Sequence, residues 1–307
     1  MTTSNNIVIK TVALAGAGGN LGQQVLAALI NAGFDVTVLV YSGSKPVSYP
    51  TPVRVVEVDY ESPDSLLDAL RGIDAVVSTL GKKTGLQSQF ALIDAAATVG
   101  VKRFVPSEFG ADLQDSKIRA FPTYQIKAQI EEYVEKKARE TGLTYTYVYN
   151  SLLFEEGLGF GVFGDLSARK VSFFDGGDTE FSFTRLATAA RAVVAVLRKF
   201  EATKNRAVRI QDLSITPREL LNTIQSLDPE HHWSPIAVDT GKLVKEAEQE
   251  LASAKFSPKA FAAFATRATF APGFAGSYKG DNELLGIEEM TEEELKNGFK
   301  EILFDVV

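Results

Sequence analysis

The glycines near the amino terminus have the types and spacing needed to bind a diphosphate. Residues 11–22 read TVALAGAGGNLG, an apolar run that turns through glycines into a helical pattern. Gly16 allows positive backbone angles, Gly19 leaves the main chain bare for a pyrophosphate, and Gly22 lets the new helix pack on the strand. Unpaired amides at the helix start attract an anion. We therefore expect six residues to bind it, namely Gly16, Gly18, Gly19, Asn20, Leu21 and Gly22.

Two alternatives remain open for this glycine bend, residues 16–22. The glycines at 16 and 18 also begin the pattern GxGxxG, whose last glycine would fall on Leu21. We prefer the GxxGxxG spacing, because its glycines match the three roles given above. The second alternative is a glycine-rich turn without a ligand.

A loop without carboxylates follows the second predicted strand. Enzymes that use NAD often carry Asp or Glu at this point to bind the adenine ribose. This chain carries Tyr41, Ser42, Ser44 and Lys45 instead. Hydroxyls and a lysine can bind a ribose 2′-phosphate through hydrogen bonds and charge, so the loop favours NADPH over NADH. A polar loop without a ligand is the alternative.

The elements that must position these groups alternate between strand and helix. Apolar and β-branched runs predict strands at residues 11–15, 35–40, 53–58, 75–78, 103–105 and 144–149. Alternation with helices predicts a parallel sheet with a ligand crevice at the carboxyl ends of its strands. At these ends we expect Asp59 to bind the adenine amino group. The short segment Thr79, Leu80 and Gly81 should accept the nicotinamide half of the cofactor.

Residues typical of helix starts support the predicted alternation of strands and helices. Ser62 before Pro63 and Thr216 before Pro217 are typical of helix starts. In the helix expected at residues 87–99, Phe90, Ile93 and Ala97 are predicted to face inward.

The composition is that of a globular protein without cysteine chemistry. The 307 residues are 45% hydrophobic and 23% charged, which suits one large α/β domain or two closely joined ones. The net charge of −7 gives no basic surface for nucleic acid, and the absence of Cys excludes disulfides and thiol nucleophiles. A polar amino terminus and the lack of any apolar run near ~20 residues predict a cytoplasmic protein without signal peptide or membrane span. His231 and His232 are adjacent and lack nearby ligands, so no metal is expected.

Several blocks of the sequence resemble the NmrA-like, isoflavone-reductase-like branch of the atypical short-chain dehydrogenases. The block GVKRFVPSEFG at residues 100–110 is the most specific of them. The others are the glycine bend, Gln87, Lys127, and residues 173–178 and 216–220. The resemblance spans about residues 11–225 and implies a Rossmann-type, doubly wound parallel sheet with a smaller α/β substrate domain. It divides the chain at 1–150 and 151–307, with some later elements returning to the sheet.

The resemblance also implies site residues. It places Lys127 beside the nicotinamide ribose, where an ammonium can hold ribose hydroxyls and stabilise an oxyanion; a solvated lysine is the alternative. Tyr124 precedes the lysine by three residues rather than four, so we expect it to line the pocket. The remaining implied cofactor contacts are Gln87, Pro106, Ser107, Glu108, Phe109, Asn150 and Phe154.

The substrate side is less defined. The candidate contacts are Phe109, Tyr124, Phe154 and Phe160. Phe160 lies in the glycine-aromatic segment, residues 157–164, which is either a mobile lid or a loop that packs its phenylalanines. Glu155 and Glu156 are expected to be solvated. Glu131 and Glu132 stand where plant members tend to carry arginines, which predicts a change of surface charge.

The resulting hypothesis is an NADPH-dependent reductase of a small aromatic or conjugated carbonyl, enone or quinone-methide-like substrate. Lys127 would hold the nicotinamide ribose and stabilise developing charge. The alternatives are an NADP(H)-sensing regulator that acts through a protein partner, and an isomerase or dehydratase that retains its cofactor. Neither nucleic acid nor membrane is expected as a partner, and a homodimer is left open.

Overall fold

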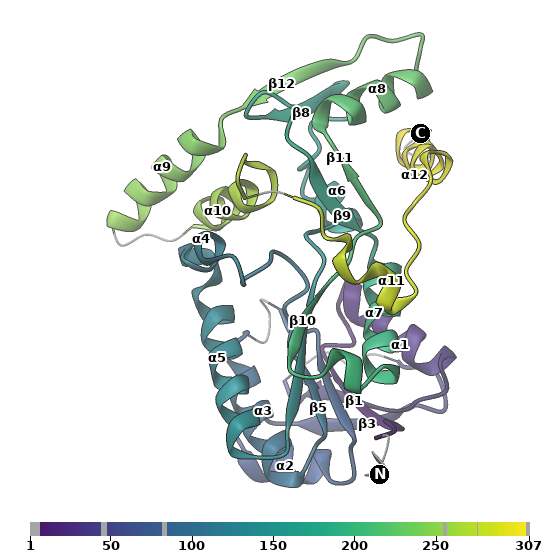
Figure 1. Cartoon of the computed structure of the whole chain (residues 1–307), viewed down its shortest axis with the longest axis vertical. Helices are drawn as coiled ribbons and strands as arrows, with labels where there is room; N and C mark the ends of the chain where they lie inside the picture. Colours follow the sequence, from purple (N-terminus) through teal and green to yellow (C-terminus); the bar gives the residue numbers. More distant parts are fainter. Residues whose placement is uncertain (1–6, 44–47, 82–84, 254–256, 275, 305–307) are drawn as a thin grey trace, which may run out of the picture.

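A parallel sheet of seven strands forms the centre of the larger part of the molecule (Figure 1). The computed structural model describes residues 7–43, 48–81, 85–253, 257–274 and 276–304. The strand order is β10-β6-β5-β4-β1-β2-β3, and all neighbours pair in parallel. The strands are β1 Thr11–Ala15, β2 Asp35–Tyr41, β3 Arg54–Val58, β4 Ala75–Ser78, β5 Arg103–Val105, β6 Thr144–Tyr149 and β10 Arg206–Arg209.

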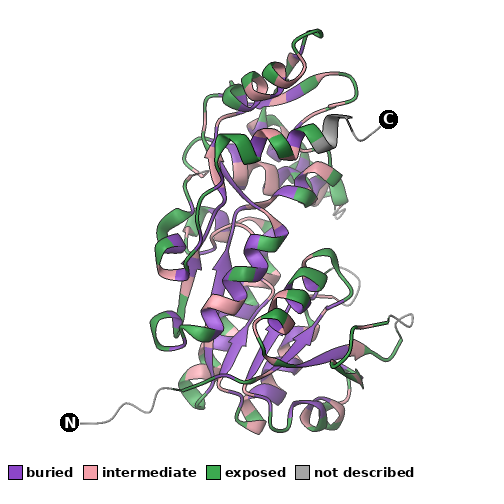
Figure 2. Cartoon of the chain, turned by 90° about the vertical axis from the view of Figure 1, so that its right-hand side faces the viewer, coloured by how far each residue is buried: buried purple, intermediate pink, exposed green. Residues whose placement is uncertain are grey.

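Helices cover both faces of this sheet, as expected for a doubly wound fold. Along β1, Val12 and Leu14 pack toward α1 and α7, whereas Ala13 and Ala15 pack toward α2, α3 and α5. Side chains of a strand alternate between its two faces, so both faces of β1 are buried, as Figure 2 shows for the sheet. The covering helices are α1 Asn20–Asn31, α2 Pro63–Leu70, α3 Ser88–Val99, α5 Gln125–Glu140 and α7 Leu186–Arg198.

Two predicted helix starts have the expected caps. The Ser62 side chain accepts a hydrogen bond from the Ser65 amide at the start of α2. Thr216 and Glu219 form a reciprocal capping box at the start of α8. Of the predicted inward residues of α3, Ile93 is fully buried, and Phe90 and Ala97 are partly buried against the same core. The buried face is wider than predicted, because it also includes Gln89, Leu92 and Ala96.

The second part of the molecule contains two small sheets around an aromatic core. One sheet has the order β11-β9-β7 and the other pairs β12 with β8. Phe154, Phe163, Phe181 and Phe299 lie in the core between them and the helices. The strands are β7 Leu152–Leu153, β8 Lys170–Phe174, β9 Phe181–Thr184, β11 Leu213–Ile215 and β12 Ser234–Val238. The helices are α6 Phe154–Gly159, α8 Pro217–Leu227, α9 Thr240–Ala252, α10 Pro258–Phe270, α11 Asn282–Leu285 and α12 Glu292–Phe304.

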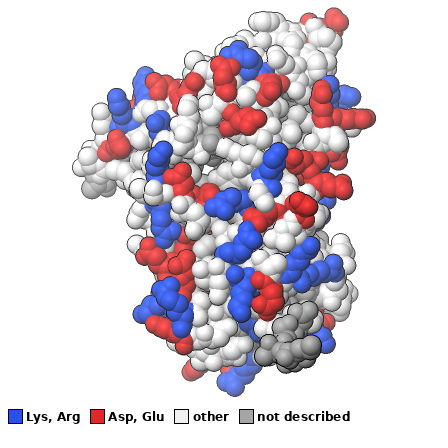
Figure 3. Space-filling model, viewed as in Figure 1, with Lys and Arg blue, Asp and Glu red and all other residues white. Residues whose placement is uncertain are grey.

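The chain crosses between the two parts more than once. It leaves the large sheet after β6, returns with α7 and β10, and leaves again at β11. Short helical turns join these elements at α4 Ser116–Arg119, η1 Pro122–Tyr124, η2 Glu201–Thr203 and η3 Lys279–Asp281. Basic and acidic side chains are interspersed over the face shown in Figure 3. Arg209 on β10 forms an ion pair with Asp112 at 2.6 Å.

Within the described part of the chain, no helix is both long and apolar enough to cross a membrane.

Candidate functional site

The glycine bend joins β1 to α1 in a tight turn. Gly16 has a φ of +89°, and a Cβ there would lie 2.7 Å from the main chain of Thr79. A Cβ on Gly22 would lie 2.1 Å from the Gly16 carbonyl oxygen. Both positions therefore require glycine for packing, as the sequence predicted.

The middle of the bend has more space. A Cβ on Gly18 would meet its nearest neighbour, the Tyr49 hydroxyl, at 3.9 Å, and one on Gly19 would meet the Gly16 oxygen at 3.6 Å. Gly19 is the N-cap of α1 and offers no side chain to bind the first amides of the helix. The main chain at the start of α1 can therefore bind an anion. Leu21 is half-buried against the α1 face of the sheet.

Thr79 connects the bend to the neighbouring strand. Its amide and its hydroxyl both donate to the Ala15 carbonyl oxygen, at 2.8 and 3.0 Å. Leu80 is buried and Gly81 is exposed. This short segment thus lies at the carboxyl ends of β1 and β4, next to the glycine bend.

The loop after β2 is only partly described. Tyr41 stacks on Tyr60, with ring centroids 6.3 Å apart, and the Ser42 amide donates to the Val58 carbonyl oxygen at 3.0 Å. Asp59 accepts a hydrogen bond from the Glu61 amide at 2.9 Å. Ser44 and Lys45 lie outside the described residues. The preference for a 2′-phosphate therefore stays a prediction.

Lys127 meets the block after β5. Its ammonium donates to the main-chain carbonyl oxygen of Glu108 and lies 3.9 Å from Glu108 Oε2. The Glu108 amide donates to the Pro106 carbonyl oxygen at 2.8 Å, and Phe109 adopts a positive φ of 30°. This compact turn presents the Glu108 carbonyl to the first turn of α5, where Lys127 lies.

The end of β6 lies beside the same turn. The Gly110 carbonyl oxygen accepts hydrogen bonds from the amides of Asn150 and Ser151, at 3.1 and 3.0 Å. Asn150 is fully buried, and its main-chain oxygen accepts from the Thr184 hydroxyl at 2.8 Å. Lys127, Glu108 and Asn150 thus come together although they are distant in the sequence.

Sequence reasoning missed Gln89. Its Oε1 accepts a hydrogen bond from the Ser107 amide at 2.9 Å, and the side chain is fully buried. The family landmark Gln87 is exposed just before α3. A polar residue two positions into an apolar helical stretch was the available signal for Gln89.

The electrostatics centre on two buried glutamates. Burial raises the pKa of Glu108 to about 7, the Lys127 ammonium opposes this effect, and Glu131 adds to it. Burial also raises the pKa of Glu131, against hydrogen bonds from Tyr149 and Arg119, both at 2.5 Å. The prediction that Glu131 lies on the surface was wrong, because α5 turns this side chain toward β6. Glu132 does lie on the surface.

The four aromatic candidates occupy different environments. Phe109 packs with the α1 face of the sheet. Tyr124 is buried, which raises its pKa, and Tyr278 adds to the shift. Phe154 packs on Phe163 and Phe183 in the aromatic core, and its expected place beside the nicotinamide and substrate stays a prediction. Phe160 is 75% exposed.

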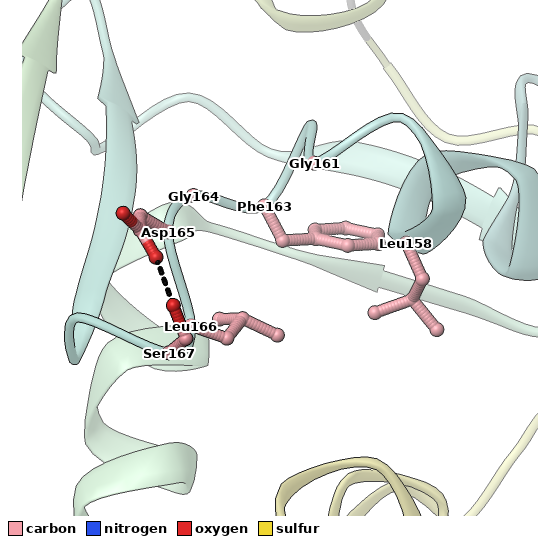
Figure 4. Close-up of a pocket in the computed structure, with 7 residues that line it drawn as sticks. All are labelled: Leu158, Gly161, Phe163, Gly164, Asp165, Leu166 and Ser167. Carbon is pink, nitrogen blue, oxygen red and sulfur yellow. Dashed lines mark hydrogen bonds between the residues drawn. The ribbon is translucent and has the colours of Figure 1, made fainter. Parts of the chain in front are cut away.

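The glycine-aromatic segment, residues 157–164, has one phenylalanine in the core and one in solvent. Phe163 is buried in the aromatic core, whereas Phe160 points into solvent from the end of α6. Figure 4 shows the cavity beside this segment, with a volume of about 370 Å³. The Ser167 hydroxyl donates to Asp165 there at 2.7 Å. The lining residues are Leu158, Gly161, Phe163, Gly164, Asp165, Leu166 and Ser167.

Glu155 is exposed, as expected, and Glu156 is half-buried, and both also accept hydrogen bonds. Glu156 accepts a hydrogen bond from the Asn20 side chain at 2.7 Å, which joins α6 to the glycine bend. Glu155 accepts from the Leu186 amide at 2.9 Å, at the start of α7. Both carboxylates therefore connect α6 to the large sheet.

Several buried polar atoms near Lys127 have no hydrogen-bond partner among the described residues. Among the described residues, neither carboxylate oxygen of Glu108 accepts a hydrogen bond, and Asn150 Oδ1 and Gln89 Nε2 have no partner. Buried polar atoms without partners are uncommon in folded proteins. Together with the open main chain at Gly18 and Gly19, they fit a dinucleotide that crosses the carboxyl ends of β1, β4, β5 and β6.

Comparison with known proteins gives consistent results. The model of the NmrA-like family matches residues 9–224. An oxidoreductase of Aspergillus flavus, aprR, is 33% identical over 258 residues, which cover 81% of this chain and 84% of the relative. Leucoanthocyanidin reductase of Vitis vinifera in complex with NADPH has a TM-score of 0.75 at 20% identity, covering 94% of this chain and 99% of the other. AtPrR2 with NADP+ and (+)-pinoresinol has a TM-score of 0.73 at 20% identity, covering 95% and 99%.

Proposed function

The chain belongs to the NmrA-like family, and on that basis we propose that it is an NADPH-dependent reductase of a small aromatic or conjugated acceptor. The acceptor would be a carbonyl, an enone or a quinone-methide-like molecule. The observation that carries the proposal is the Lys127 ammonium, which is held by the Glu108 carbonyl at the carboxyl ends of β5 and β6. The glycine bend lies at the same edge of the sheet.

The relatives support this assignment. The Aspergillus flavus relative is named an oxidoreductase. Two structural neighbours were solved with NADPH or NADP+, one of them together with pinoresinol. These neighbours agree with a nicotinamide cofactor and a small organic substrate.

Each residue then has a distinct task. NADPH, when bound, supplies the hydride. The glycine bend would hold its diphosphate through the amides at the start of α1. Lys127 would bind the ribose hydroxyls and stabilise negative charge on the acceptor oxygen. Asn150 and Gln89 offer further polar atoms to the cofactor.

Removing the ammonium tests this proposal. We expect Lys127→Ala to lower turnover roughly a hundredfold while NADPH affinity stays within about tenfold, since the glycine bend is intact. Turnover is followed by the absorbance of reduced nicotinamide with a panel of phenolic enones, and affinity by calorimetry. Lys136→Ala is the control, because this lysine lies on the same helix with its side chain 62% exposed.

The same experiment separates the alternatives. Unchanged turnover in Lys127→Ala would contradict the role of the lysine. Tight NADPH binding without turnover of any acceptor would instead favour the sensing function. Calorimetry with NADH beside NADPH tests the cofactor preference expected from Ser42, Ser44 and Lys45.

A further inference from the structure

The Glu108 carboxyl has an unusual position beneath the candidate catalytic lysine. Its side chain is 1% exposed, and its Oε2 lies 3.9 Å from Lys127 Nζ. Neither of its oxygens accepts a hydrogen bond from a described residue. A buried carboxyl that serves only packing would normally be hydrogen-bonded or replaced by an apolar residue.

Charged groups act on this carboxyl from several elements. Lys127 on α5 favours its anion, and so does the Arg119 guanidinium at the end of α4. Glu131, one turn further along α5, disfavours the anion. The Tyr149 hydroxyl on β6 donates a hydrogen bond to Glu131. The charge of Glu108 contributes to a raised pKa of Tyr149. Lys127 is the group in direct ion-pair contact.

We propose that Glu108 is the positioning residue of Lys127, fixing its ammonium through the main-chain carbonyl and setting the charge beside it through the buried carboxyl. The two contacts come from one residue, so the ammonium and the carboxyl cannot move apart without rearranging the turn at residues 106–110. This role rests on the proposed function, in which Lys127 acts on the acceptor.

The proposal has a consequence for pH. Burial brings the pKa of Glu108 to about 7, so the carboxyl is neutral below that pH and anionic above it. In the neutral form only the carbonyl holds the ammonium. In the anionic form an opposite charge is added in a buried site, where it is screened little by solvent.

An infrared titration tests the pair without any substrate. The absorption of the protonated Glu108 carboxyl is obtained by subtracting the spectrum of Glu108→Gln at each pH. We expect this absorption to disappear as pH rises through about 7. In a Lys127→Met background the transition should move upward by about one pH unit or more, because the anion loses its partner.

The result of this titration does not depend on whether the protein turns over an acceptor. Glu140→Gln, at the exposed end of the same helix as Lys127, should leave the transition in place. A transition at the same pH with and without Lys127 would overturn the proposal, even if the protein reduces an enone. A shifted transition would support the pair even if no acceptor were turned over.

The rate of NADPH oxidation supplies the second measurement. Glu108→Gln mimics the neutral carboxyl, so we expect turnover near that of the wild type at pH 6 and roughly tenfold lower at pH 8. A purely structural role would lower turnover by the same factor at both values. Equal factors would therefore count against the proposal.

Discussion

A buried carboxyl such as Glu108 makes protein stability depend on pH. Its pKa is raised from 4.5 to about 7, so the folded protein retains a proton that the unfolded chain releases between these values. The unfolded state then binds fewer protons, and the free energy of unfolding falls as pH rises through this window.

Glu108→Gln should remove this dependence. Relative to the wild type, we expect the free energy of unfolding of the variant to rise by about 3 kcal/mol between pH 4.5 and pH 8. Urea denaturation at several pH values measures the difference. Parallel stability curves would show that Glu108 is ionised throughout.

At the residue scale, the sequence predicted backbone requirements better than burial. The positive φ of Gly16 and the close packing at Gly22 followed from local spacing. The burial of Glu131 did not, because it depends on Arg119 and Tyr149, which approach from other elements. A residue type alone does not show which neighbours will surround it.

At the scale of elements, two glycines of the same bend should differ in effect. A methyl group at Gly22 would lie 2.1 Å from the Gly16 oxygen, so Gly22→Ala should cost roughly 1–3 kcal/mol and weaken NADPH binding. Gly19 has a φ of −82° and more space. Gly19→Ala should therefore keep its thermal stability but lose tenfold or more in NADPH affinity, since its methyl obstructs the diphosphate. Equal losses of stability in the two variants would contradict this division of roles.

The hydrogen bond between Asn20 and Glu156 places a carboxylate beside the proposed diphosphate site. Glu156→Gln can still accept this bond but carries no charge, so we expect NADPH to bind several-fold more tightly at low salt. The gain should shrink as salt rises. Calorimetry at two salt concentrations measures both effects, with the exposed Glu248→Gln on α9 as control. An unchanged or weaker affinity would place the diphosphate away from Glu156.

Elements with strong local signals were predicted well. The strands at 75–78 and 144–149 have the expected bounds, and the caps at Ser62 and Thr216 are formed. The buried face of α3 is wider than the predicted stripe, because α2 and α5 both pack on this helix. The spacing of apolar residues predicts which face of a helix is buried only when a single face packs against the rest of the protein.

At the scale of the molecule, the alternation of strands and helices correctly predicted a parallel, doubly wound sheet. The strand order depends on contacts between distant segments and cannot be read from local patterns. Two elements from beyond residue 150 belong to this part of the molecule. β10 forms the edge of the sheet beside β6, and α7 packs on α1. The division at residue 150 therefore remains our proposal for the cofactor-binding part, rather than a boundary of independent folding.

Arg103 shows how the two halves of the chain depend on each other. Its buried guanidinium on β5 donates to hydroxyls of Thr144, Thr146 and Thr203 and to the Phe200 carbonyl oxygen. Arg103→Met would leave these acceptors buried without their donor, so we expect a loss of about 3 kcal/mol or more in the free energy of unfolding. Arg71→Met, whose side chain is 73% exposed, should change it by less than about 0.5 kcal/mol. Because Phe200 and Thr203 follow α7, the loss should appear in one cooperative transition that includes both halves. A separate early transition confined to residues after 185 would show instead that the sheet is stable without them.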